Sequence, residues 1–142
     1  MSDKDAVVAT LEDYADAYCA KDLDRLMSIF VDNGDVSLIG TGNDELCSTR
    51  DEIAAVFSRN FRDATATRFE WIWRDVAIHG QAATVAASLN IHLMMDSSPL
   101  TVQIRWTVSM IKTGGLWKWV HRHASAAAGS QDDGAAYPIV AD

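Results

Sequence analysis

The stretch that decides the fold is residues 114–125, GGLWKWVHRHAS, in which two glycines form a turn and a strand follows. Side chains two positions apart share one face of a strand. One face of this strand therefore carries Trp117, Trp119, His121 and His123, and the other carries Lys118, Val120, Arg122 and Ala124. The aromatic and titratable face indicates either the polar end of a pocket or a packed edge of the core. A bulge near Val120 would exchange the two histidines with Lys118 and Arg122.

Three more strands precede this one, because apolar residues recur with period 2 over residues 69–78, 84–95 and 100–112. A change of phase in the first of them predicts a bulge near Asp75. The other two strands share an apolar face made of Leu89, Ile91, Leu93, Val102, Ile104, Trp106 and Val108. Their opposite face is polar and consists of Ser88, Asn90, His92, Gln103, Arg105, Thr107 and Ser109.

The apolar sheet face permits two arrangements. In a monomer it would meet the helices, and the polar face would meet water. In a homodimer it would pack on a second sheet, and the polar face would line a cavity under the helices. We expect the homodimer, because Val102, Ile104, Trp106 and Val108 offer more apolar area than one layer of helices needs.

Helical periodicity precedes the strands. Ser2 caps a first helix that runs to about residue 20, and Asp22 caps a second that ends at an Asp-Asn-Gly turn, residues 32–34. A short strand covers residues 36–39. Thr49 and Glu52 form a capping box for a third helix that ends near Arg62. The intervening GTGNDE, residues 40–45, is a loop and not a dinucleotide motif, because the third glycine is missing.

The composition is that of one globular domain: the chain has 142 residues, 49% of them apolar and 23% charged. The formal net charge of −8 argues against nucleic acid or an anionic membrane surface as partner. No secretory signal precedes the first helix, so we expect a cytoplasmic protein. Cys19 and Cys47 lack metal-ligand or redox spacing and are expected to be free thiols.

Tyrosine, histidine and arginine side chains are the candidates for chemistry. Tyr14 and Tyr18 lie one turn apart on the apolar stripe of the first helix, as core residues or as phenols that donate to an oxyanion. His121 and His123 have two-ligand spacing without a recognisable third ligand, so we expect no metal and no cofactor. Arg105 either binds a carboxylate or extends into water.

We expect these candidates to line one cavity beneath the helices. The predicted ligand-binding residues are Tyr14, Tyr18, Trp71, Asn90, His92, Arg105, His121 and His123. Of these, Tyr14, His121 and His123 are the candidates for catalysis. The tail from residue 126 is small, polar and acidic, so only Tyr137 and Ile139 can attach it to the domain.

The order of elements, the GTGNDE loop followed by STRDEI, and the ending WKWVHRHAS resemble the NTF2-like superfamily, specifically its SnoaL-like branch. The resemblance covers residues 5–128 and leaves residues 129–142 as a tail. It implies an α+β cone in which three N-terminal helices pack on a curved, mostly antiparallel sheet. It also implies a small molecule bound in a hydrophobic cavity, with lyase, cyclase or isomerase chemistry.

Two motifs resemble particular members of that superfamily. QIRWT is similar to the association domain of calcium/calmodulin-dependent kinase II, where Arg105 matches an arginine that lines a pocket. Its two other pocket arginines fall on Asn90 and Ala124, and this resemblance implies the alternative function, a non-catalytic association module. LEDYADAYCAKDLD is similar to the first helix of ketosteroid isomerase, whose oxyanion-hole tyrosine falls on Tyr14. The general base of that enzyme falls near Ile39, which cannot accept a proton.

Overall fold

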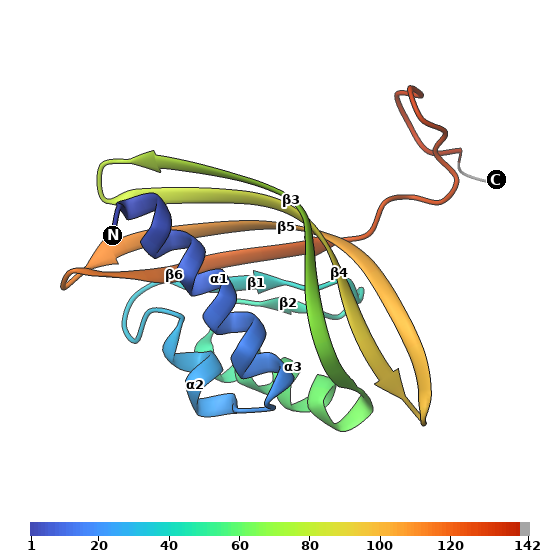
Figure 1. Ribbon diagram of the computed structural model, residues 1–142, viewed down its shortest axis with the longest axis horizontal. Helices are drawn as coiled ribbons and strands as arrows, with labels where there is room; N and C mark the ends of the chain where they lie inside the picture. Colours follow the sequence, from blue (N-terminus) through green and yellow to red (C-terminus); the bar gives the residue numbers. More distant parts are fainter. Residues whose placement is uncertain (140–142) are drawn as a thin grey trace.

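The computed structural model describes residues 1–139 and shows helices packed on a curved sheet (Figure 1). Its helices are α1 (Asp3–Cys19), α2 (Leu23–Ser28) and α3 (Arg50–Asp63). Its strands are β1 (Ser37–Ile39), β2 (Leu46–Cys47), β3 (Thr65–His79), β4 (Ala82–Met95), β5 (Ser98–Thr113) and β6 (Leu116–Ser125). The predicted α+β fold is confirmed, and β2 is an element that the sequence pattern missed.

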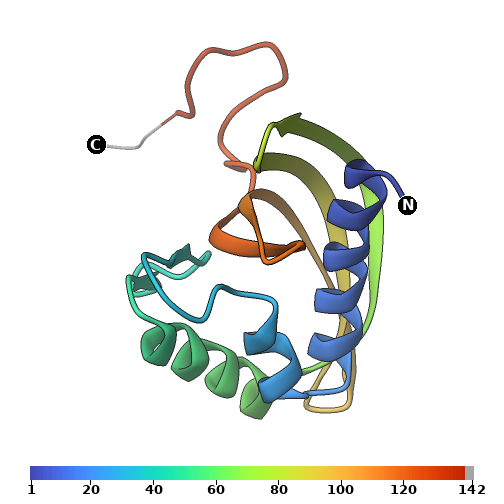
Figure 2. The same cartoon turned by 90° about the vertical axis from the view of Figure 1, so that its left-hand side faces the viewer.

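The strands form one open sheet in the order β2-β1-β6-β5-β4-β3. All neighbouring pairs are antiparallel except β1 and β6, which run parallel, so the predicted mostly antiparallel sheet is confirmed. Figure 2 shows the sheet curving around the helices, which lie on its concave side. The strand quoted first in the sequence, β6, therefore occupies the interior of the sheet between β1 and β5.

Local signals set the ends of these elements as predicted. The Ser2 hydroxyl accepts from the Asp5 amide at 3.1 Å, and the Asp5 carboxylate accepts from the Ser2 amide at 3.2 Å, which together cap α1. The Thr49 hydroxyl caps α3 by accepting from the Glu52 amide at 3.1 Å, and the Glu52 carboxylate accepts from the amide of Ser48 instead of that of Thr49. Gly114 and Gly115 have φ of 58° and 79°, a left-handed conformation that glycine adopts without steric cost, and they form the turn into β6.

The apolar face of β4 and β5 points toward the helices. Leu89 and Val108 are completely buried, and Ile104 and Trp106 are nearly so. The expected dimer contact through this face is therefore wrong, because the face packs on the helices of the same chain. The helices and the cavity described below account for the apolar area that had suggested a second sheet.

The pairing of β3 with β4 shifts at two places, once between Ala66 and Arg68 and once three residues before the predicted bulge. Pairing with β4 shifts between Trp71 and Trp73, so Ile72 is the extra residue rather than Asp75. An extra residue reverses the alternation of faces. Trp71 consequently points to the core, whereas Trp73 is 56% exposed on the convex face.

An aromatic cluster joins α1 to the sheet. The rings of Tyr14 and Trp119 stack with centroids 4.8 Å apart, and Trp106 meets Tyr14 edge-on at 4.9 Å. The Trp119 indole donates to the Thr10 hydroxyl at 2.9 Å, so its polar atom is satisfied inside the core. This cluster fixes the position of Tyr14 relative to β6.

The tail leaves the body of the molecule after β6 (Figure 1). Tyr137 and Ile139 are 83% and 74% exposed, so neither side chain attaches it to the domain. Residues 140–142 of the predicted tail lie outside the described residues. Cys19 and Cys47 are free thiols, as predicted. Within residues 1–139, no helix combines the length and the apolar character needed to span a membrane.

Candidate functional site

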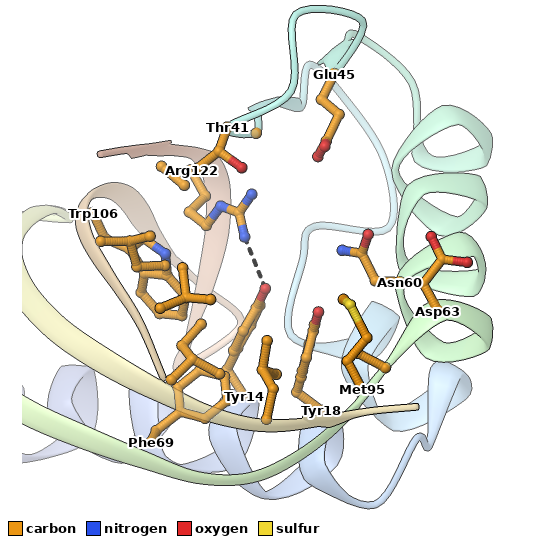
Figure 3. Close-up of a pocket in the computed structure, with 17 residues that line it drawn as sticks. Tyr14, Tyr18, Thr41, Glu45, Asn60, Asp63, Phe69, Met95, Trp106 and Arg122 are labelled. Carbon is orange, nitrogen blue, oxygen red and sulfur yellow. Dashed lines mark hydrogen bonds between the residues drawn. The ribbon is translucent and has the colours of Figure 1, made fainter. Parts of the chain in front are cut away.

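A cavity of about 300 Å³ opens between the concave face of the sheet, α1, the β1–β2 loop and α3 (Figure 3). Its sheet wall is apolar and is made by Phe69, Ile91, Leu93, Val102, Ile104 and Trp106. Tyr14 and Tyr18 from α1 add two phenols, and Asn60 and Asp63 from α3 add polar groups. The cavity is thus an apolar chamber with a small number of polar groups, which is the usual make-up of a small-molecule site.

The basic side chain that lines this cavity is Arg122 of β6. Its side chain is only 7% exposed. Its Nη1 donates to the Tyr14 hydroxyl at 2.9 Å, and its guanidinium lies 5.5 Å from the Trp106 ring centroid. The ion pairs formed within residues 1–139 do not include Arg122. A buried cation without a carboxylate partner is costly, so an anionic or carbonyl oxygen in the cavity would stabilise it.

Two polar hydrogens at this wall also lack a partner. Among the described residues, Arg122 Nε and Trp106 Nε1 are buried without a hydrogen-bond acceptor. Buried donors are normally paired, and unpaired ones in native structures call for an explanation. This end of the cavity therefore has an excess of donors over acceptors.

Tyr14 adds a further donor. Its oxygen accepts from Arg122, which leaves its own proton for an acceptor in the cavity. Burial raises the pKa of Tyr14 above its ordinary value, although the charge and hydrogen bond of Arg122 oppose that rise. Burial likewise raises the pKa of Tyr18. Both groups therefore stay protonated at neutral pH and can donate hydrogen bonds.

Arg122 reaches the cavity because β6 contains a bulge at Val120. In β5, the adjacent residues Met110 and Ser109 pair with Trp119 and His121. Val120, which lies between these two in β6, therefore has no residue opposite it. On the other edge of β6, the Trp119 backbone forms hydrogen bonds with the backbones of Ile29 and Val31. From His121 onward, this edge pairs with β1. The strand therefore points Trp117 and Trp119 inward, and then Arg122 and Ala124.

The predicted placement of His121 and His123 in the cavity is wrong for the same reason. Both rings lie on the convex side of β6, where His121 Nδ1 is 2.7 Å from the Ser37 hydroxyl and His123 is exposed. Partial burial, followed by the charge of His123, lowers the pKa of His121. Within the described residues, no three His, Cys, Asp or Glu side chains gather into a metal-binding group.

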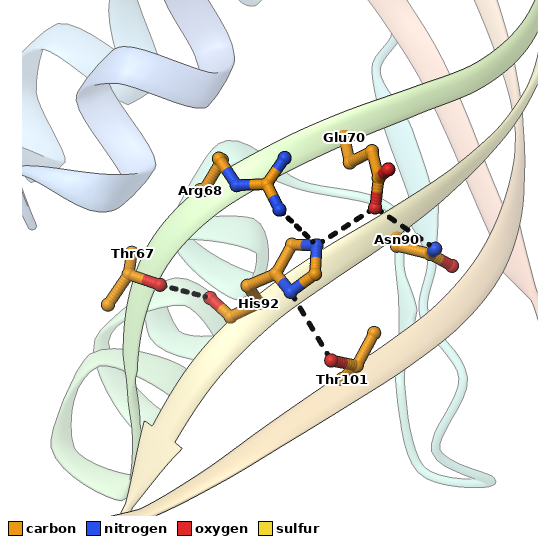
Figure 4. A network of polar contacts seen from close by, with 6 residues as sticks. All are labelled: Thr67, Arg68, Glu70, Asn90, His92 and Thr101. Carbon is orange, nitrogen blue, oxygen red and sulfur yellow. Dashed lines mark hydrogen bonds and ion pairs between the residues drawn. The ribbon is translucent and has the colours of Figure 1, made fainter.

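The predicted placement of Asn90, His92 and Arg105 is also wrong, because their strand face is the convex one. Asn90 and His92 belong to a surface network in which the Glu70 carboxylate accepts from both, at 3.3 and 3.0 Å (Figure 4). The hydrogen bond from His92 is the main reason why the pKa of Glu70 is lowered. Arg105 is exposed on the same face.

Of the eight predicted residues, the structure brings only Tyr14 and Tyr18 into the cavity. Trp71 packs on Trp106 with ring centroids 5.8 Å apart, but it lines a separate hollow between α1 and β3. Arg122 was predicted on this face only as the result of a bulge near Val120, and the structure contains that bulge. Sequence reasoning missed Glu45, Asn60 and Asp63, which come from a loop and a helix end that no periodic pattern relates to the sheet.

The comparisons with known proteins agree with this architecture. Residues 7–129 match the model of the SnoaL-like domain. A protein of Streptomyces avermitilis, provisionally assigned as a dehydratase of the NTF2-like family, has 20% identity and a TM-score of 0.77, with 96% of each chain covered. At 17% identity, a ketosteroid isomerase-like protein of Erwinia carotovora atroseptica has a TM-score of 0.72, over 87% of this chain and 95% of that one.

A third similar structure is provisionally assigned as a calcium/calmodulin-dependent protein kinase II association domain, from Xanthomonas campestris. It has 20% identity and a TM-score of 0.77, over 87% of this chain and 86% of that one. Among curated proteins, none matches this sequence. Structural likeness at such identities shows a shared fold and does not transfer an activity. The match over residues 7–129 shows that the chain belongs to the SnoaL-like domain family.

Proposed function

We propose that this protein binds a small molecule with an apolar body and an oxygen acceptor, either a carboxylate or a carbonyl, at one end. The observation that carries the proposal is the buried Arg122, whose guanidinium has no carboxylate partner among residues 1–139 and shares the cavity wall with the Tyr14 hydroxyl. The acceptor would bind these donors, and the apolar body would cover the sheet wall.

A pair of arginine variants tests this proposal. Calorimetry should show that Arg122→Met binds 3-phenylpropionate with an affinity at least tenfold lower than that of the wild type, because a charge-assisted hydrogen bond is lost. Arg105→Met removes the same charge from the convex face and should leave binding unchanged. Equal binding by the wild type and Arg122→Met, or equal losses in the two variants, would refute the proposal.

The same geometry favours acid/base chemistry of the lyase, cyclase or isomerase type. A ligand carbonyl that accepts from Tyr14 and Arg122 would be polarised, and developing negative charge on its oxygen would be stabilised. The carboxylates of Glu45 and Asp63 line the same cavity and supply proton acceptors. Tyr14→Phe should then lower kcat by about 100-fold or more while a carboxylate inhibitor still binds. A variant that loses kcat and inhibitor binding equally would indicate a binding role alone.

The alternative function is association, with the dimer contact on the convex face. That face exposes Ile72 and Trp73, which are 52% and 56% accessible. A homodimer through these residues is compatible with a ligand site on the opposite face. Sedimentation of Trp73→Glu should show monomers if this contact forms, and a wild type that sediments as a monomer would refute it.

A further inference from the structure

The GTGNDE loop, residues 40–45, holds a carboxylate in a set position. The Gly40 amide donates to the Glu45 carbonyl at 2.9 Å, and the Glu45 amide donates to the Gly42 carbonyl at 3.0 Å, so the loop closes on itself. The Glu45 side chain folds back over both glycines. A Cβ on Gly40 would collide with Glu45 Oε2, and a Cβ on Gly42 would lie 2.6 Å from Oε1. A Cβ at either glycine would therefore displace the Glu45 carboxylate from this position.

Arg59 of α3 restrains the same side chain. Its Nη2 lies 3.3 Å from Glu45 Oε1, and its Nη1 donates to Asp44 Oδ2 at 2.8 Å. The two acidic neighbours differ sharply in environment, because the Glu45 side chain is 15% exposed and that of Asp44 is 71% exposed. Glu45 is thus the carboxylate that the loop turns inward, and Asp44 is the one that it leaves in water.

Glu45 is directed into the cavity and faces Arg122 across it (Figure 3). The two ends of the polar region are therefore chemically opposite: Arg122 and Tyr14 offer donors, and Glu45 offers acceptors. A ligand that carried only an acid group would remove water from Glu45 without replacing its hydrogen bonds. Arg59 pairs with Glu45 Oε1, so the hydrogen bonds lost are those that water makes to the rest of the carboxylate, and their loss weakens binding.

The geometry points to a ligand that carries both an acceptor and a donor. Its carboxylate or carbonyl accepts from Arg122 and Tyr14, and a neighbouring hydroxyl donates to Glu45. This inference rests on the proposed function, because it assumes that Arg122 binds the acceptor end. It narrows the ligand class from apolar acids and ketones in general to their hydroxylated members.

A matched series of probes tests the inference by calorimetry. The probes are 3-phenylpropionate, 2-hydroxy-3-phenylpropionate and 3-hydroxy-3-phenylpropionate, which differ only in the presence and position of one hydroxyl. At least one hydroxy acid should bind the wild type about tenfold more tightly than 3-phenylpropionate. In Glu45→Ala this preference should disappear. Asp44→Ala, which removes the same charge from the same loop outside the cavity, should keep it.

The possible outcomes separate the inference from the proposed function. If the probes bind through Arg122 but the hydroxy acids show no preference, or if Glu45→Ala keeps the preference, the inference is wrong and the proposed function stands. If none of the probes binds, or if Arg122→Met binds them all as the wild type does, both are wrong. A preference that Asp44→Ala loses as fully as Glu45→Ala would also overturn the inference, because it would reflect the loop's net charge.

Discussion

The two faces of the sheet hold their polar residues in opposite physical situations. On the convex face, Glu70, Asn90 and His92 satisfy one another in contact with water. On the concave face, Arg122 is buried with one phenol as its side-chain partner and no carboxylate within the described residues. An exposed network of this kind contributes little to stability and leaves nothing for a ligand to complete. The buried arginine is costly to the fold, and this unsatisfied state is what makes the concave face the candidate site.

The largest expected difference between the faces concerns their tryptophans. Trp119 is fully buried at the centre of the aromatic cluster, whereas Trp73 projects from the convex face. Trp119→Ala should lower the free energy of unfolding by about 4 kcal/mol, because it leaves a cavity in the core. Trp73→Ala should change it by less than about 1 kcal/mol. Urea denaturation measures both, and a comparable loss in Trp73→Ala would mean that the convex face is covered in solution.

Replacing an arginine on each face should change the free energy of unfolding by less than Trp119→Ala does, and on the concave face the change should be an increase. Arg122→Met replaces a buried charge, which pairs with no carboxylate of residues 1–139, with an apolar side chain and should raise the free energy of unfolding by about 1 kcal/mol or more. Arg105→Met on the exposed face should change it by less than about 0.5 kcal/mol. Denaturation without added ligand is the appropriate measurement. A clear decrease in the free energy of unfolding of Arg122→Met would show that Arg122 stabilises the fold through its hydrogen bond to Tyr14, which would argue against a residue kept for ligand binding.

The smallest effect concerns the pH dependence of stability and a histidine on the convex face. The pKa of His121 is lowered in the folded protein from its ordinary value of 6.5, chiefly by burial. The unfolded state then binds the proton more tightly, so His121 contributes full stability above pH 6.5 and loses it as the pH falls below that value. The Tm of His121→Gln should therefore decrease less than the Tm of the wild type as the pH is lowered from 7 to about 5. Identical slopes for both proteins would contradict this assignment.

Several features of the fold were predicted correctly from the sequence alone. The caps at Ser2 and Thr49 and the glycine turn before β6 depend on contacts within a few residues, and these were predicted with their positions. The apolar faces of β4 and β5 also followed from alternation, and so did the choice of Tyr14 and Tyr18 as cavity candidates. Local chemistry and side-chain periodicity were sufficient for these features.

Tertiary structure decided the rest of the site. A single extra residue, Val120, determines whether Arg122 or its neighbouring histidines enter the cavity, and that bulge arises from pairing with residues 29–31 and β1, far away in the sequence. Glu45 joins Arg122 only because a loop closed by its own backbone bonds and by Arg59 brings it to the cavity. Alternation gives the two faces of a strand, but only the packing of distant segments decides which face is inside.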